Sequence, residues 1–200
     1  MQTMRIIAFL LLSPTRLVID YLKRPGGEHG AAVLLRWNHG FFCFDIAVAI
    51  VLGISTTVAS KWPIPTCLAL ILLALAYSRC NEVTYAFLRD ANRELEHEDP
   101  TTPLPSGKRI KMAMRSYVGL LINFAVMYYF LPQCLYKPHF ENFVDALYFS
   151  GVTLATLGYG DIVPVHIASK LLSLYEVLSG MLLVVVAVAV YFSGHVQKKA

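Results

Sequence analysis

Residues 140–165 read FENFVDALYFSGVTLATLGYGDIVPV, a stretch that is largely apolar but interrupted by Gly151, Gly158, Gly160 and Pro164. These interruptions make it too irregular for a helix that crosses a membrane, and its apolar residues make it a poor loop in water. Irregular backbone at membrane depth is tolerated only where protein surrounds it or where it lines a cavity. We therefore expect a re-entrant segment, which enters the membrane and leaves it on the same side.

The first half of this stretch predicts a short helix. Asn142 is followed three residues later by Asp145, which is the pattern of a capping box. The helix expected over residues 143–155 is about 20 Å long, so it cannot cross the ~30 Å hydrocarbon core. Its C-terminal end is expected to stop near the bilayer centre, where the partial negative charge of that end favours cations.

Glycine recurs at every second position in the sequence TLGYGD of residues 156–161. Glycine adopts backbone conformations denied to other residues, so successive carbonyls can face one axis instead of alternating as in a strand. Such carbonyls replace the hydration water of an ion, and the Thr156 hydroxyl can add a further ligand. Carbonyls left unpaired at this depth cost several kcal/mol each. The sequence therefore predicts a symmetric ring of identical chains, closed as a homotetramer.

The whole chain has the composition of an integral membrane protein, with 56% of its 200 residues hydrophobic and 15% charged. The net charge of +4 does not indicate nucleic acid, because the basic residues flank apolar runs. The four cysteines show no spacing typical of disulfides or zinc sites. No glycine loop with a lysine and no nucleophile paired with a base is evident, so we expect neither an enzyme nor a cofactor.

Four apolar runs predict spanning helices, at residues 41–60, 65–77, 112–131 and 171–192. The expected fold class is an all-α membrane protein with four transmembrane helices per subunit. The second run is short, so Arg79 is expected to snorkel to the headgroups and its helix to continue to residue 96. Tyr128 is expected at the membrane interface. We divide the chain into an N-terminal cytoplasmic or interfacial segment, a two-helix hairpin, a linker, a pore domain and a cytoplasmic tail, at residues 1–40, 41–95, 96–108, 109–194 and 195–200.

The distribution of basic residues predicts the sidedness of these helices. Fourteen of the seventeen Lys and Arg lie before the first run, between the second and third, or after the last. Only Lys61, Lys137 and Lys170 lie on the other side. Because cytoplasmic loops carry the excess of basic residues, we expect both termini in the cytoplasm and a multi-pass protein of the plasma or inner membrane.

The sequence TLATLGYGD of residues 153–161, followed by Pro164 and a long apolar helix, closely resembles the pore module of potassium channels. The resemblance covers about residues 112–193. It implies that Thr156, Leu157, Gly158, Tyr159 and Gly160 form a selectivity filter. The first four would coordinate dehydrated K⁺ through their carbonyls, with Leu157 standing where the family most often has valine and Tyr159 favouring K⁺ over Na⁺.

The same resemblance suggests residues that support the filter and the gate. Asp161 is similar to an aspartate that bonds an aromatic residue of the pore helix, a position that Tyr148 holds here, and Thr153 belongs to the supporting segment. Gly180 aligns with the hinge glycine of the inner helix, although close helix packing is an alternative reason for a glycine. Glu176 is expected to hydrogen-bond behind the filter or to face the central cavity.

These features predict passive, potassium-selective permeation, gated by the inner helices, the filter or both. An ordinary voltage sensor is not expected, because residues 41–60 and 65–77 lack repeated basic residues. We expect the hairpin to pass a signal through residues 79–115 to the outer pore helix. The alternatives are a nonconducting sensor or regulatory subunit that keeps the pore fold, and a weakly selective cation channel. His139, His166 and His195 are expected to be solvated loop residues, and a pH-sensing role for them is the alternative.

Overall fold

The computed structural model describes residues 13–23, 27–58, 64–95 and 104–196. Its helices are α2 (Pro14–Leu22), α3 (Gly27–Val58), α4 (Thr66–Leu95), α5 (Ser106–Phe130), α6 (Phe143–Leu154) and α7 (Ile167–Val196). The other elements are a short 3-10 helix, η1 (Gln133–Leu135), and the two-residue strands β1 (Tyr136–Lys137) and β2 (Val163–Pro164). The regular structure of the described residues is therefore almost entirely helical.

Four of these helices contain segments long and apolar enough to cross a membrane, namely Gly27–Thr57, Thr66–Arg93, Gly107–Phe130 and Ile167–Ala189. Helix α6 has 12 residues and is too short to do so. The predicted all-α membrane fold with four spanning helices is confirmed.

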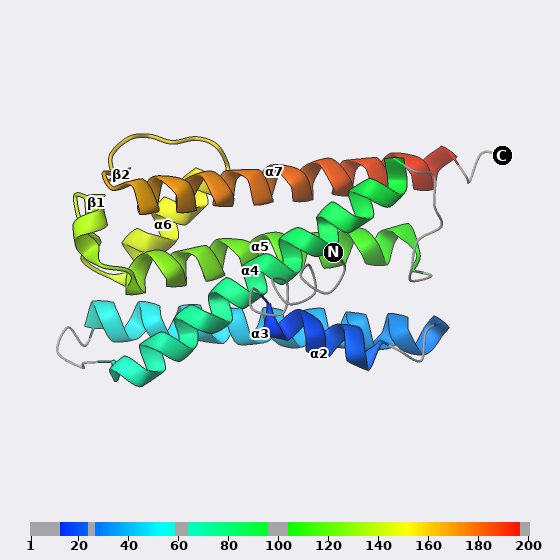
Figure 1. Cartoon of the computed structure of the whole chain (residues 1–200), viewed down its shortest axis with the longest axis horizontal. Helices are drawn as coiled ribbons and strands as arrows, with labels where there is room; N and C mark the ends of the chain where they lie inside the picture. Colours follow the sequence, from blue (N-terminus) through cyan, green and yellow to red (C-terminus); the bar gives the residue numbers. More distant parts are fainter. Residues whose placement is uncertain (1–12, 24–26, 59–63, 96–103, 197–200) are drawn as a thin grey trace, which may run out of the picture.

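Helix α5 lies at the centre of the packing and contacts α3, α4, α6 and α7 (Figure 1). Its side chain Tyr128 is fully buried and packs against the rings of Tyr136, Phe140 and Phe149. The expected interfacial position of Tyr128 is therefore wrong, because α6 and the loop before it cover this end of α5.

Helix α3 starts at Gly27, well before the apolar run that predicted it. The added turns carry polar side chains that bond to neighbouring helices. The amide Nδ2 of Asn38 donates to Ser116 Oγ of α5 at 3.0 Å, and Trp37 Nε1 donates to Glu82 Oε1 of α4 at 2.9 Å. Polar contacts of this kind hold membrane helices together, and a search for apolar runs does not detect them.

Arg79 does not snorkel to the headgroups, contrary to the expectation. Its side chain is only 6% exposed, with Nη1 at 2.7 Å from Glu82 Oε2 and the guanidinium 4.0 Å from the ring centre of Phe41. Asp45 of α3 is buried close by. Helix α5 approaches Asp45 closely at Gly119. A Cβ on this glycine would lie 3.0 Å from Asp45 Oδ2. The protein itself thus supplies the counter-charges that headgroups and water would otherwise supply.

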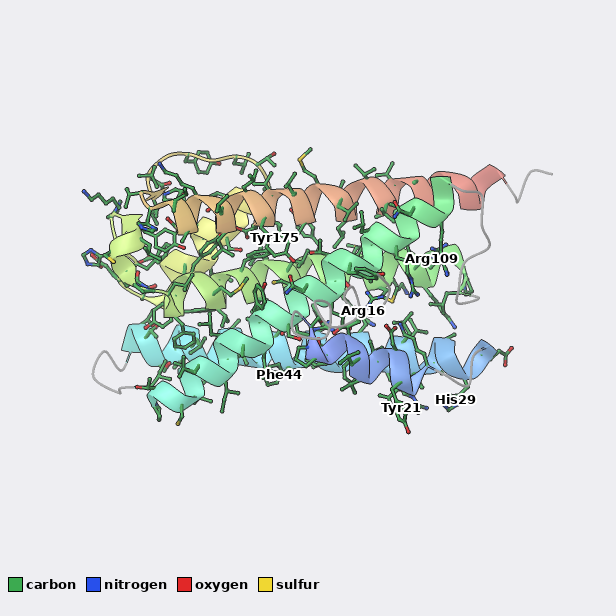
Figure 2. All side chains as sticks on the ribbon, viewed as in Figure 1. Arg16, Tyr21, His29, Phe44, Arg109 and Tyr175 are labelled. Carbon is green, nitrogen blue, oxygen red and sulfur yellow. The ribbon has the colours of Figure 1, made fainter. Side chains whose placement is uncertain are left out.

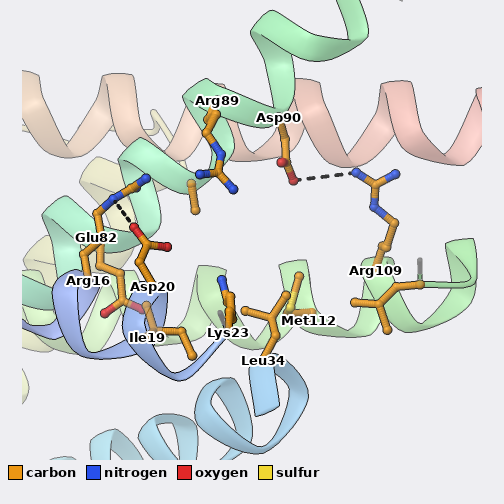
Figure 3. Close-up of a pocket in the computed structure, with 12 residues that line it drawn as sticks. Arg16, Ile19, Asp20, Lys23, Leu34, Glu82, Arg89, Asp90, Arg109 and Met112 are labelled. Carbon is orange, nitrogen blue, oxygen red and sulfur yellow. Dashed lines mark ion pairs between the residues drawn. The ribbon is translucent and has the colours of Figure 1, made fainter. Parts of the chain in front are cut away.

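A charged pocket lies where α2, α4 and α5 meet (Figure 3). Arg16 pairs with Asp20 at 3.3 Å, and Arg109 of α5 pairs with Asp90 of α4 at 3.6 Å. Burial also lowers the pKa of Lys23, the residue that follows α2. The Arg109–Asp90 pair attaches the start of α5 to α4, whereas the Arg16–Asp20 pair lies within α2.

The segment after α5 folds back onto the start of α7. Strand β1 pairs antiparallel with β2, with Tyr136 opposite Pro164. The carbonyl of Leu135 accepts hydrogen bonds from Val165 N at 3.0 Å and from Ser169 Oγ at 2.9 Å. The loop between α6 and α7 is therefore held at its far end by the segment that follows α5.

Candidate functional site

Helix α6 begins with the capping box that the sequence predicted. The Asn142 side chain accepts from the backbone N–H groups of Val144 and Asp145, and the Asp145 carboxylate accepts from Asn142 N. The next backbone donor, Phe143 N, bonds to Thr56 Oγ1 of α3 at 3.1 Å. The start of this short helix is thus fixed both locally and by the N-terminal hairpin.

Helix α6 ends at Leu154, after about 18 Å of rise. The backbone then turns back on the helix end, because Thr156 N donates to Thr153 O at 2.9 Å and Leu157 N donates to Val152 O at 2.8 Å. Gly158 N lies 3.3 Å from the same Val152 carbonyl. The first part of the TLGYGD segment is therefore anchored to the C-terminal end of α6.

Left-handed backbone recurs at every second residue of this segment. The φ angle is 57° at Thr156, 53° at Gly158 and 77° at Gly160. Such values are open to glycine but uncommon for a residue such as Thr156. Leu157 and Tyr159 lie between them, with side chains 58% and 68% exposed in the single chain. The backbone thus alternates in handedness with the period that a one-sided row of carbonyls requires.

Asp161 lies at the end of this segment, next to α6. The hydroxyl of Tyr148 on α6 hydrogen-bonds the Asp161 carboxylate, and this bond holds the pKa of Asp161 below its usual value. The two side chains join the far end of the TLGYGD segment to the middle of α6, while Thr153 and Val152 hold its near end. Each end of the segment is thus bonded to the same short helix.

Glu176 of α7 lies behind α6 and is fully buried. Its Oε2 accepts a hydrogen bond from Tyr128 of α5 at 2.6 Å, and its Oε1 contacts Ser150 Oγ of α6. The carboxyl group therefore lies between α5, α6 and α7, and its expected position behind a filter or facing a central cavity stays a prediction. Neither Tyr128, which was expected at the membrane interface, nor Ser150 was predicted to contact Glu176, since they lie 48 and 26 residues from it and no local motif links them.

Gly180 lies one turn beyond Glu176, inside a helix that runs without a break from Ile167 to Val196. A Cβ placed on it would come within 2.6 Å of Leu154 Cδ1 and 3.4 Å of Leu154 O. The last residue of α6 thus packs directly on this glycine. Close packing accounts for the glycine in this structure, and a hinge role stays a prediction.

Within the residues that the structure describes, no group of three or more His, Cys, Asp and Glu side chains is placed to hold a metal ion. His139 and His166 are exposed. His195 belongs to α7, so the expected loop position is wrong for this residue, and its side chain lies outside the described residues.

The short helix, the segment of alternating backbone handedness after it, and a membrane-length helix on each side match the order of elements expected for an ion-channel pore module. In agreement with this geometry, residues 116–194 match the family described as "Ion channel".

Relatives include two-pore potassium channels 1 and 3 of Arabidopsis thaliana. The first is 38% identical over 81 residues, which are 40% of this chain and 21% of the relative. The second is 33% identical over 96 residues, which are 48% of this chain and 21% of the relative. A hyperpolarization-activated voltage-gated potassium channel of Methanocaldococcus jannaschii is 39% identical over 67 residues, 29% of this chain and 32% of the relative. No solved structure matches significantly.

Residues 116–194 are therefore similar to an ion-channel domain, and the relatives named above are potassium channels. The matches cover about a fifth of the length of the Arabidopsis relatives, and the family match leaves α2, α3 and α4 outside. These relatives are channels rather than enzymes.

Proposed function

We propose that this protein is a potassium-selective channel in which four copies of the chain surround one conduction axis. The observation that carries the proposal is the left-handed backbone at Thr156, Gly158 and Gly160, directly after a helix too short to span. In this proposal the carbonyls of Thr156, Leu157, Gly158 and Tyr159 replace the hydration water of K⁺, and the ions move passively from site to site.

The exposed surface of the single chain supports assembly around an axis. Residues 155–161 are exposed throughout, although they belong at membrane depth in this proposal. Helix α7 also presents an apolar stripe of exposed side chains at alternating spacings of three and four residues, namely Leu171, Leu174, Leu178, Met181, Val185 and Val188. A stripe with this spacing is typical of helices that pack in parallel around a common axis. Neighbouring copies would cover both surfaces.

The orientation and the division into domains are part of the proposal. Fourteen of the seventeen basic residues fall on the side that holds both termini, so this side is assigned to the cytoplasm and the filter entrance to the outside. Asp161 then lies at the outer mouth, where its negative charge attracts cations. Residues 109–194 form the pore domain and residues 41–95 a hairpin attached to it.

The test is rubidium uptake by proteoliposomes that contain the full chain, with Na⁺ as the competing ion. We expect uptake that excess Na⁺ does not suppress, barium to block it, and Gly158→Asp to abolish it. Gly53→Ala is the matched control, because a Cβ at this helical glycine meets no other atom within 4 Å. Chemical cross-linking in the same vesicles is expected to yield a species of four chains.

Other results would favour the alternative functions. Uptake that Na⁺ suppresses equally well indicates a weakly selective cation channel. Assembly of four chains without any uptake indicates a sensor or regulatory subunit that keeps the pore fold, and unaltered uptake by Gly158→Asp indicates conduction elsewhere in the protein.

A further inference from the structure

The carboxyl group of Glu176 joins three helices at one buried point. It accepts from Tyr128 of α5 through Oε2 and meets Ser150 of α6 through Oε1, while Glu176 itself belongs to α7. Ser150 and Leu154 are four residues apart on α6, and their partners Glu176 and Gly180 are four residues apart on α7. The two helices thus touch at two points one turn apart, one polar and one apolar, directly before Thr156.

No cation balances this carboxyl group among the described residues. Arg16 pairs with Asp20, Arg79 with Glu82 and Arg109 with Asp90, and the interacting groups at Glu176 are the hydroxyls of Ser150 and Tyr128. An ionised carboxylate that is fully buried without a cation carries a large desolvation penalty. The protonation state of Glu176 therefore depends on the hydrogen bonds that its carboxyl group makes.

The contacts of the Ser150 hydroxyl indicate whether the Glu176 carboxyl group carries a proton. Its Oγ is 2.8 Å from the carbonyl oxygen of Leu121 on α5 and is also within hydrogen-bond distance of Glu176 Oε1. A serine hydroxyl has a single proton, whereas a carbonyl and a carboxylate only accept. If Glu176 were ionised, Ser150 would donate to one of these oxygens and face the other with no proton between them.

A protonated Glu176 removes this conflict. Its Oε1 then donates to Ser150 Oγ, Ser150 donates to Leu121 O, and Tyr128 donates to Oε2 as before. Every polar atom of the cluster has a partner, and the chain of hydrogen bonds begins and ends on α5. Fully satisfied networks of this kind hold buried helices in one arrangement.

We infer that Glu176 is a neutral carboxylic acid that donates its proton to Ser150, and that Ser150 and Tyr128 are positioning residues for the pore helix. The bond fixes the rotation and height of α6 on α7 and so the starting point of the filter. This consequence for conduction rests on the proposed channel function, whereas the protonation state does not.

Infrared spectroscopy of the full chain in lipid tests the protonation state without any need for conduction. The C=O stretch of a protonated carboxylic acid is separate from the bands of carboxylates, and it shifts in D₂O. We expect such a band in the parent protein, its loss in Glu176→Gln and its shift in Tyr128→Phe. Asp45→Asn is the matched control, since Asp45 is a buried acid in a different helix and its removal leaves the Glu176 band in place.

Rubidium uptake tests the positioning role. Glutamine reproduces the donor and the acceptor of a protonated acid, so Glu176→Gln is expected to keep uptake within about twofold of the parent. Glu176→Ala leaves buried hydroxyl groups without partners and is expected to lower uptake by about tenfold or more.

The inference is overturned if the parent lacks the infrared band, or if Glu176→Gln assembles normally but loses uptake as Glu176→Ala does. If the parent itself does not conduct, the proposed function fails while the infrared result still decides the protonation state.

Discussion

Gly180→Ala separates close packing from a hinge at this glycine. The new Cβ would lie 2.6 Å from Leu154 Cδ1 and 3.2 Å from Leu154 Cγ, whereas carbon atoms prefer about 3.5–4.0 Å. Leu154 is only 3% exposed and cannot simply turn away. Overpacking of this kind costs about 1–3 kcal/mol, and alanine recovers about 1 kcal/mol in helix propensity. We therefore expect a net destabilisation of up to about 2 kcal/mol, with lower rubidium uptake because the end of α6 must move.

A second substitution in the same contact provides the decisive comparison. Leu154→Ala removes the two atoms that the new Cβ would meet, so it is expected to be destabilising alone but to cancel the clash in the double variant. The free energy of unfolding, followed by SDS titration in mixed micelles, should show a coupling of about 1–3 kcal/mol between the two sites. If the effects on stability and uptake simply add, the clash is not the cause, and a hinge role becomes the better account of Gly180.

Three further substitutions follow from single contacts. Arg79→Met leaves Glu82 without its ion-pair partner at 2.7 Å. The loss of stability is expected to be about 3–5 kcal/mol, measured as a lower midpoint of SDS unfolding. An unchanged midpoint contradicts a buried ion pair. Tyr148→Phe removes the bond that lowers the pKa of Asp161, so carbon-13 NMR titration is expected to show that pKa rise toward its ordinary value, and a pKa that does not move contradicts the contact. That bond stabilises the parent at pH values above the ordinary carboxyl pKa, and its contribution is lost as the pH falls through the lowered one. Asn142→Ala is expected to cost about 1 kcal/mol through loss of the cap, visible as a lower thermal midpoint, whereas Asn142→Ser keeps an acceptor and should differ little from the parent.

Local sequence signals predicted the parts of the site that depend on neighbouring residues. The capping box of Asn142 and Asp145 and the short helix it starts follow from residues only a few positions apart. The glycines of the TLGYGD segment likewise mark the backbone that takes left-handed φ values, although the same angle at Thr156 was not expected from its residue type.

Contacts between distant helices were not predictable in the same way. Arg79 was expected in the headgroups because its own run is short, yet Glu82 and the ring of Phe41 surround it. The Tyr128 position at the end of an apolar run is equally typical of an interfacial ring, and only the packing of α6 against α5 makes it a buried donor. Such roles depend on which helices meet, and no periodicity within one helix carries that information.

Helix α4 makes direct side-chain contacts with α7 that the sequence did not predict. Besides its packing on α5, α4 bonds to the inner helix α7 itself. Tyr175, labelled in Figure 2, donates to Asn81 Oδ1 at 2.7 Å, and Thr84 donates to Ser179 Oγ at 2.9 Å. Tyr175 and Ser179 directly precede Glu176 and Gly180, which contact α6.

Neighbouring residues of α7 therefore face two different partners. Tyr175 and Ser179 are bonded to α4, whereas Glu176 and Gly180 pack against α6. Polar contacts between membrane helices stabilise their association because an unpaired polar group in hydrocarbon is costly. A shift of α4 along α7 must break both bonds or move α7 with it, and a shift of α7 displaces the residues on which α6 rests. Helices α4 and α6 are thus mechanically joined through α7 as well as through α5.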